Sequence, residues 1–334
     1  SAILKWIGMS HSKSMQTIEK MVERVLELAK EVSWQAEIVK YPRSRSPKSI
    51  DIALHKKAFI KIVDSVLKLS SNEIQDLKKA SYTLDISPII VAERIGRHRL
   101  EEGVVYDKSG VPLISITTLA MFAKGDKVFI YSKKGSYYVK INAQMLRTLR
   151  ERLGMSLGEL AYKIGVSRKA VYEYERGTMD VTIETAERIY EVLGHESVFD
   201  SLDIFSMRPK LKEEEEPSPH STTENKLVKE LRNIGLLTHH LRHTAADIVA
   251  SKEDSKYIIV LTEEHHDKEP DLKVRESIKL SKASQSKLIV LTEHITSLEE
   301  MVESYGVSES SDVIIEKPNN IHKVIREIRM YLRR

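Results

Sequence analysis

The 334-residue sequence contains no cysteine, which excludes disulfide bonds and thiolate metal sites. It also lacks an apolar run close to the about 18 residues that a membrane-spanning helix needs, and nothing in it resembles a signal peptide. Charged residues are abundant at 31%, as is typical of thermophile proteins. We therefore expect a soluble cytoplasmic protein without a membrane partner, long enough for two or three domains.

Charge is distributed unevenly along the chain, although the net charge is only +4. Residues 1–142 carry 24 basic and 15 acidic side chains, a net charge of +9. Residues 143–199 have a net charge of −1, and residues 200–334 a net charge of −4. Electrostatic attraction to nucleic acid is therefore expected from the N-terminal third.

Residues 142–200 carry the signals of four short helices. Ser156 and Glu159 have the spacing of a capping box at the start of the second helix. Gly165 permits a sharp turn, and Ser167 caps the third helix. Apolar residues recur at helical spacing on the inner side of each segment. Two short helices that meet at a glycine turn are the helix-turn-helix unit.

The stretch from Leu157 to Gly177 reads L-x-E-L-A-x-x-x-G-V-S-R-x-x-V-x-x-Y-E-R-G. It resembles the helix-turn-helix of the XRE family, the type found in Cro and the phage repressors. The resemblance implies binding to double-stranded DNA, with the outer face of the third helix in the major groove. The expected base contacts are Arg168, Lys169, Tyr172 and Glu173, and the expected phosphate contacts are Ser156, Leu157, Ser167 and Arg176.

The residues before this segment predict a compact α/β domain. We assign 1–14 to a tail outside the fold and 15–141 to a basic N-terminal α/β domain. The domain is expected to contain an amphipathic helix over 17–32, a second helix over 72–84, an apolar buried strand at 88–92, and a hairpin over 127–141 that turns at Lys134-Gly135. The helix-turn-helix domain then spans 142–206.

After that domain, residues 207–224 combine four consecutive glutamates with proline and serine, which predicts a flexible acidic linker. Residues 225–334 then repeat the N-terminal plan, and Asp247 matches Asp51 at the start of a strand. The expected fold is multidomain: a four- or five-helix all-α helix-turn-helix domain flanked by two similar α/β domains.

Each α/β domain resembles the PD-(D/E)xK nuclease fold, the restriction-endonuclease-like fold. In that family an Asp, together with an Asp or Glu two residues before a Lys, holds the divalent metal. Asp51 and Lys61 match the pattern, but Phe59 occupies the second carboxylate position and cannot coordinate Mg²⁺. The second domain has Asp247 but no lysine in register. We predict no enzyme activity, no catalytic residue and no metal site; Glu19, Glu23 or Glu37 remain the alternative carboxylates.

Two basic clusters lie in the N-terminal third. The loop Lys40, Arg43, Arg45 and Lys48 is either a phosphate-binding arm or a solvated surface loop. Arg94, Arg97, His98 and Arg99 follow the strand at 88–92, where a small anionic effector is one interpretation and a structural role is the other. His239 and His243 have zinc-ligand spacing, but no third ligand accompanies them.

The run VAERIGRHRLEEGVVYDKSGVPLISITTL at 91–119 resembles archaeal HTH-type transcriptional regulatory proteins. We predict a sequence-specific regulator without a cofactor, nucleoid-associated in the cytoplasm, that binds double-stranded DNA as a homodimer. The α/β domains are the expected dimer interface, and a small-molecule or protein effector remains open. The alternatives are a metal-dependent nuclease targeted by the helix-turn-helix and an architectural DNA-binding adaptor.

Overall fold

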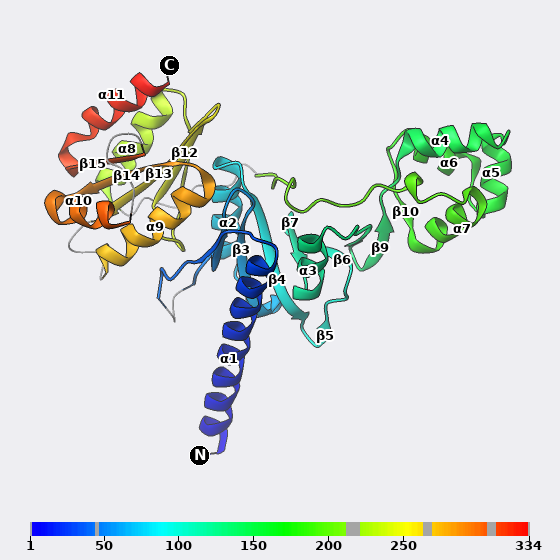
Figure 1. The fold of residues 1–334 in the computed structure, drawn as a ribbon, viewed down its shortest axis with the longest axis horizontal. Coiled ribbons are helices and arrows are strands. Elements are labelled where there is room, and N and C mark those ends of the chain that lie inside the picture. Colours follow the sequence, from blue (N-terminus) through cyan, green and yellow to red (C-terminus); the bar gives the residue numbers. More distant parts are fainter. Residues whose placement is uncertain (1, 44–46, 212–220, 263–268, 306–311, 333–334) are drawn as a thin grey trace.

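The structure is a computed structural model that describes residues 2–43, 47–211, 221–262, 269–305 and 312–332. Three parts follow one another in Figure 1: an N-terminal α/β unit, a helix-turn-helix domain that projects to one side, and a C-terminal α/β unit. The helix-turn-helix domain lies at the far end from the C-terminal unit. The two α/β units pack side by side.

The N-terminal unit is a mixed sheet with helices on its faces. Its elements are α1 (Ala2–Glu31), β1 (Ala36–Ile38), β2 (Ile52–Leu54), β3 (Ala58–Ser65), α2 (Ser71–Thr83), β4 (Ser87–Ile95), β5 (His98–Arg99), β6 (Val104–Lys108), β7 (Val111–Ile114), α3 (Ile116–Lys124), β8 (Ile130–Lys133) and β9 (Ser136–Val139). The strand β4 is parallel to both β3 and β7, as its continuous apolar sequence predicts. The predicted hairpin at Lys134-Gly135 is formed by β8 and β9.

The expectation of a tail outside the fold at the N-terminus is wrong, and the expected linker is described only at its two ends. Helix α1 begins at Ala2, so residues 2–14 are helical and are no irregular tail. This stretch contains no proline and a single glycine, so the amphipathic helix can continue into it. The described ends of the expected linker are also ordered, because Arg208 bonds to Asp85 and α8 begins at Thr222. Residues 212–220 lie outside the described residues.

The helix-turn-helix domain consists of α4 (Ala143–Arg152), α5 (Leu157–Ile164), α6 (Arg168–Glu175) and α7 (Ile183–Leu193). A short strand, β10 (Val181–Thr182), pairs with β9, so the N-terminal sheet continues into this domain. The chain then returns along the N-terminal unit, where Ile204 is fully buried and the rings of Phe205 and Trp34 meet edge to face at 5.2 Å. The domain is therefore held at both ends.

The C-terminal unit contains α8 (Thr222–Asn233), β11 (Leu237–His240), β12 (Ile248–Lys252), β13 (Ser255–Thr262), α9 (Pro270–Ser284), β14 (Lys287–Thr292), α10 (Ile295–Ser304), β15 (Val313–Glu316) and α11 (Ile321–Tyr331). Its strand order is β11-β12-β13-β14-β15, with two antiparallel pairs followed by two parallel pairs. The N-terminal strands β1-β2-β3-β4-β7 follow the same order and the same directions.

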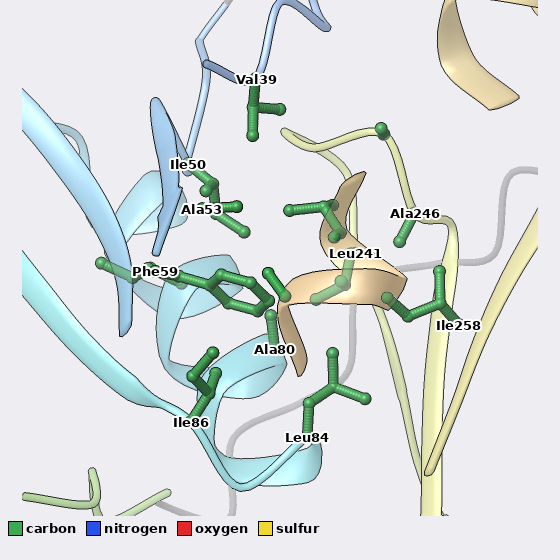
Figure 2. Close-up of a cluster of buried hydrophobic side chains, with 14 of the residues drawn as sticks. Val39, Ile50, Ala53, Phe59, Ala80, Leu84, Ile86, Leu241, Ala246 and Ile258 are labelled. Carbon is green, nitrogen blue, oxygen red and sulfur yellow. The ribbon is translucent and has the colours of Figure 1, made fainter. Parts of the chain in front are cut away.

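A shared apolar core joins the two α/β units (Figure 2). Phe59 and Leu84 of the first unit lie in the same buried cluster as Leu241 and Ile258 of the second. All four are less than 2% exposed. Burial of this kind stabilises by roughly 25 cal/mol per Å² of apolar surface removed from water. The two units therefore form one body with a common core.

Buried carboxylates extend this contact in a symmetric way. Asp76 of α2 accepts hydrogen bonds from the backbone N–H groups of Arg242 and His243, both at 2.6 Å. On the other side, Glu276 of α9 accepts from the N–H of Lys40 at 2.8 Å. In each direction, a helix of one unit caps the loop that follows the first strand of the other.

Candidate nucleic-acid interface

Helices α5 and α6 form the helix-turn-helix, and the residues at their starts have the expected capping geometry. Ser156 and Glu159 form the predicted capping box, and Ser167 Oγ accepts from the N–H of Ala170 at 3.1 Å. Val171 and Tyr174 face the domain core. Because helical residues three and four apart share a face, the side chains between them point outward. Arg168, Lys169 and Tyr172 are exposed, and Tyr172 retains 47% of its accessible surface.

The turn between α5 and α6 depends on Gly165. Its φ is +68°, in the left-handed region that glycine adopts at low cost. A Cβ at this position would lie 2.7 Å from Nη1 of Arg188, a contact that the flexible guanidinium can relieve only by moving. The turn therefore fixes the angle at which α6 is presented.

Three of the expected DNA contacts, Tyr172, Glu173 and Arg176, already interact with other side chains of the domain. The guanidinium of Arg176 lies 5.5 Å from the ring centroid of Tyr172, a cation–π arrangement. The carboxylate of Glu173 accepts a short hydrogen bond from Thr178, and Glu173 is only partly exposed. Arg168 and Lys169 thus lie at the start of α6, and the aromatic Tyr172 and the acidic Glu173 follow one turn later.

The structure corrects one expected phosphate contact. The backbone N–H of Ser156 donates to Oε2 of Glu159 at 2.7 Å, so the capping box already uses this amide. Ser167 differs, because its oxygen accepts from Ala170 while its own hydroxyl hydrogen can still donate to a phosphate. Leu157 lies at the first position of α5 and is partly exposed.

A buried ion pair that the sequence did not predict holds α4 against α6. Nε and Nη2 of Arg150 contact the two carboxylate oxygens of Glu175 at 2.5 and 3.0 Å. Nη1 of Arg150 also donates to the carbonyl of Met155 at 2.6 Å. The bidentate bond to Glu175 raises the pKa of Arg150. Glu175 is therefore a structural residue of the family pattern rather than a DNA contact.

The strand pairing that joins the helix-turn-helix domain to the sheet is reinforced by polar contacts. Oδ2 of Asp180 accepts from the hydroxyl of Tyr131 at 2.8 Å, and Oδ1 accepts from the N–H of Ile141 at 3.2 Å. Burial together with the bond to Asp180 raises the pKa of Tyr131. Asn142 donates to Asp200 at 3.0 Å, which ties the two connecting segments together.

The nuclease-like site of the N-terminal unit is centred on Asp51, immediately before β2. Its Oδ2 accepts from the N–H of Ile62 at 2.7 Å. Lys61 Nζ lies 3.3 Å from both Asp51 and Glu73, and Lys48 Nζ lies 3.0 Å from Oδ1 of Asp51. Although burial tends to raise the pKa of Glu73, the charge of Lys61 and the bonds from Ser70 hold that pKa below its ordinary value.

The C-terminal unit has the same carboxylate with a different ammonium partner. Asp247 Oδ2 accepts from the N–H of Leu261 at 2.7 Å, the counterpart of the bond from Ile62 to Asp51. Lys273 Nζ lies 2.8 Å from Asp247 Oδ1. In α9, Lys273 stands where Glu73 stands in α2, and Val260 of β13 stands where Lys61 stands in β3, so in the C-terminal unit the ammonium group comes from the helix instead of the strand.

These donors do not fit a divalent metal. Phe59, at the position of the second carboxylate, is fully buried in the core shared by the two units. The Asp51 carboxylate is paired with the ammonium groups of Lys48 and Lys61, and that of Asp247 with the ammonium group of Lys273. Mg²⁺ needs several oxygen ligands in near-octahedral geometry. Within the described ranges, no three His, Asp or Glu residues are grouped so that they could hold a metal.

Two of the three alternative carboxylates share a cleft with Asp51. Glu19 and Glu23 of α1 line a cleft of about 750 Å³ that also reaches Asp51 and Arg275 of α9. Glu37 is instead paired with His55 at 2.8 Å.

The expected basic arm at residues 40–48 needs correction. Lys48 turns inward, and its Nζ donates to the carbonyl of Val39 at 3.0 Å as well as contacting Asp51. Arg43 is exposed and pairs with Glu269 at 2.9 Å. Lys40 is exposed, and Arg45 lies outside the described residues. The strong charge of Asp51 accounts for the inward position of Lys48, which the sequence pattern could not show.

The histidines with zinc-ligand spacing take part in the contact between the α/β units. His239 Nδ1 is 2.9 Å from the hydroxyl of Thr83. His243 donates its N–H to Asp76, and its carbonyl accepts from Ser49.

Comparisons with known proteins agree with this geometry. Residues 16–128 match the family model of the PD-(D/E)XK superfamily domain, and residues 146–198 match that of the helix-turn-helix. The chain is therefore a multidomain DNA-binding protein that combines a nuclease-like domain with an XRE-type helix-turn-helix. No helix within the described residues is both long and apolar enough to cross a membrane.

Curated relatives place the chain in a family. A "Putative HTH-type transcriptional regulatory protein" of Saccharolobus islandicus (strain Y.G.57.14) is 32% identical over 317 residues, covering 93% of this chain and 97% of the relative. A relative of that name in Saccharolobus solfataricus is 31% identical with the same coverage. One in Aeropyrum pernix is 33% identical over 222 residues, 64% of this chain and 66% of the relative. The chain belongs to this family of archaeal HTH-type transcriptional regulatory proteins.

Among solved structures, the SINR protein/SINI protein complex matches 28% of this chain and 82% of its own chain, at 23% identity and a TM-score of 0.15. This overlap is too small to support an argument.

Proposed function

We propose that this protein is a sequence-specific transcriptional regulator that binds operator DNA as a homodimer through α6. The observation that carries the proposal is the capped helix α6, which exposes Arg168, Lys169 and Tyr172 on a domain anchored to the sheet by β10. An arginine can bind guanine O6 and N7 as a fork, with about 1–3 kcal/mol of discrimination for each bidentate contact. In this proposal the protein acts in the cytoplasm on nucleoid DNA.

We further propose that the C-terminal unit is a second nuclease-like domain and that neither unit hydrolyses DNA. The strand order of the C-terminal unit and the bond from Leu261 to Asp247 support a nuclease-like fold. Phe59 and the ammonium groups that pair with Asp51 and Asp247 support a lack of hydrolysis. Metal-dependent hydrolysis needs a metal that generates a nucleophile from bound water, and these residues offer it too few oxygen ligands.

The homodimer rests on the presence of one helix-turn-helix in each chain. Relatives of this domain class bind two half-sites about one helical turn apart, so full operator recognition needs two such domains. The face of the N-terminal unit that carries α2 is already covered by the C-terminal unit, so a homodimer would use another surface.

The double variant Arg168→Ala, Lys169→Ala tests the proposed base contacts. We expect the wild type to bind a selected operator at least about 10³-fold more tightly than a scrambled duplex, and the variant to lose most of that ratio. Lys226→Gln, Lys229→Gln is the matched control, because it removes two exposed charges from α8. Unchanged discrimination in the α6 variant would place sequence recognition elsewhere.

A further inference from the structure

The strand β4 continues beyond the sheet core and forms a projecting hairpin with β5. Its residues are buried as far as Ala92, and its last three are exposed. Arg94 pairs with Arg99 and Ile95 with His98, so Gly96 and Arg97 form a two-residue turn. Gly96 has a φ of +61°, the conformation that such a turn needs at its first position. Figure 1 shows β5 at the lower edge of the N-terminal unit, away from the C-terminal unit.

This hairpin concentrates exposed cationic side chains. Arg94, Arg97, His98 and Arg99 are all exposed within six residues. Arg94 is 3.4 Å from the buried Asp64, which Lys68 also contacts at 2.7 Å. In the part of the chain that the structure describes, Arg97 and Arg99 form no ion pair with another side chain. The structure places this cluster on the β4–β5 hairpin.

Exposed aliphatic side chains lie beside these cations. Leu67, in the short helical turn after β3, is 73% exposed, and Ile95 is 36% exposed. Leu67 Cδ1 would lie 3.4 Å from a Cβ built on Gly96, so Leu67 rests against the hairpin turn. Minor-groove binders combine cationic side chains with apolar side chains that insert between base steps, and arginines also contact the phosphates beside the groove.

We infer that the β4–β5 hairpin is a second DNA-binding element that grips the duplex outside the base pairs contacted by α6, independently of sequence. Arg97 and Arg99 contact phosphates, and Leu67 and Ile95 lie against the minor-groove edge. This inference rests on the proposed function of the helix-turn-helix domain. Residues 143–199 have a net charge of −1, so the helix-turn-helix domain needs an electrostatic partner elsewhere, and residues 1–142 carry +9.

The experiment compares wild type with Arg97→Gln, Arg99→Gln on duplexes with and without about 20 flanking base pairs, as the salt concentration is varied. Each neutralised phosphate contributes about 0.9 to the slope of log Kobs against log[salt]. We expect the magnitude of this slope to be smaller by about 2 for the variant on the long duplex. Its affinity for operator and for scrambled DNA should fall by the same factor, and the flanking base pairs should not increase its affinity. Lys226→Gln, Lys229→Gln is again the charge-matched control and should retain the wild-type slope.

A wild-type slope in the hairpin variant on the long duplex would overturn the inference. A selective loss of operator binding would also overturn it, because it would make the hairpin a base-reading element. Both failures are distinct from failure of the proposed function, in which wild type itself would show no preference for any sequence. Both changed residues are exposed, so an unchanged melting temperature verifies that the fold is retained.

Discussion

At the residue scale, the most informative positions are the buried carboxylates that pair with lysines. Asp51 stands at the position of the first nuclease carboxylate, where it accepts from the N–H of Ile62 and pairs with Lys48 and Lys61. In the second unit, Lys273 of helix α9 pairs with Asp247. A buried carboxylate without a counter-charge would be strongly destabilising, so we expect these lysines to stabilise the fold.

Glu73→Gln tests this arrangement through its pH dependence. The variant removes one of the two carboxylates on Lys61, and we expect a loss of about 2–3 kcal/mol in the free energy of unfolding at neutral pH. Because the folded-state pKa of Glu73 is lowered, its contribution is present above the unfolded value of about 4.3 and is lost as the pH falls through the lower folded value.

Urea denaturation of both proteins from pH 7 to pH 3 is the measurement. The difference between wild type and variant should shrink below about pH 4. An exposed control, Glu102→Gln, should show little difference at any pH. A difference for Glu73→Gln that stays constant down to pH 3 would contradict the ion-pair account.

The sequence predicted residues well where the signal was local. The capping box of Ser156 and Glu159 and the cap at Ser167 depend on spacings of three residues, and both are present. The inward position of Lys48 and the pair of Arg150 with Glu175 were missed, because their partners are set by tertiary contacts. A charged residue in a pattern does not reveal whether it faces solvent or a buried counter-charge.

At the element scale, helices α2 and α9 have a double role. Each packs on its own sheet and also caps a loop of the opposite unit through a buried carboxylate, Asp76 or Glu276. A single helix thus links the core of one unit to the backbone of the other.

Asp76→Ala should separate the two roles. The change leaves the N–H groups of Arg242 and His243 without their acceptor, and we expect the free energy of unfolding to fall by about 2–3 kcal/mol. Asp76→Asn retains one acceptor oxygen and should cost less. Chemical denaturation followed by circular dichroism measures the free energy of unfolding of both variants. A loss below about 0.5 kcal/mol for Asp76→Ala would show that the capping bonds are dispensable.

Strands with a clear apolar pattern were predictable from the sequence, whereas a polar strand was not. The apolar sequence of β4 indicated a strand between parallel neighbours, and the structure has it so. The strand β11 (Leu237–His240) was missed because it reads Leu-Thr-His-His, with no alternation of apolar and polar residues. Hydrogen bonding to the neighbouring strand β12 and packing against α2 form this strand, and α2 lies in a distant part of the chain.

At the scale of the whole molecule, the chain contains one DNA-reading domain and two α/β units that share a core. The symmetric contacts between the units resemble a dimer folded within one chain. The sequence indicated the repeat but could not show that the units pack on each other, because the partners Asp76 and Arg242 are 166 residues apart. The expected homodimer therefore needs a surface other than the one that carries α2.

The measurement that tests the central claim most directly is selection of bound duplexes from a random DNA pool, at a stated salt concentration and without added metal. We expect an enriched motif with two-fold symmetry and half-sites about one helical turn apart, because each chain supplies one α6. Binding without an enriched motif would contradict sequence-specific regulation and favour an architectural role. An enriched motif without symmetry would support sequence recognition by α6 but contradict binding as a homodimer.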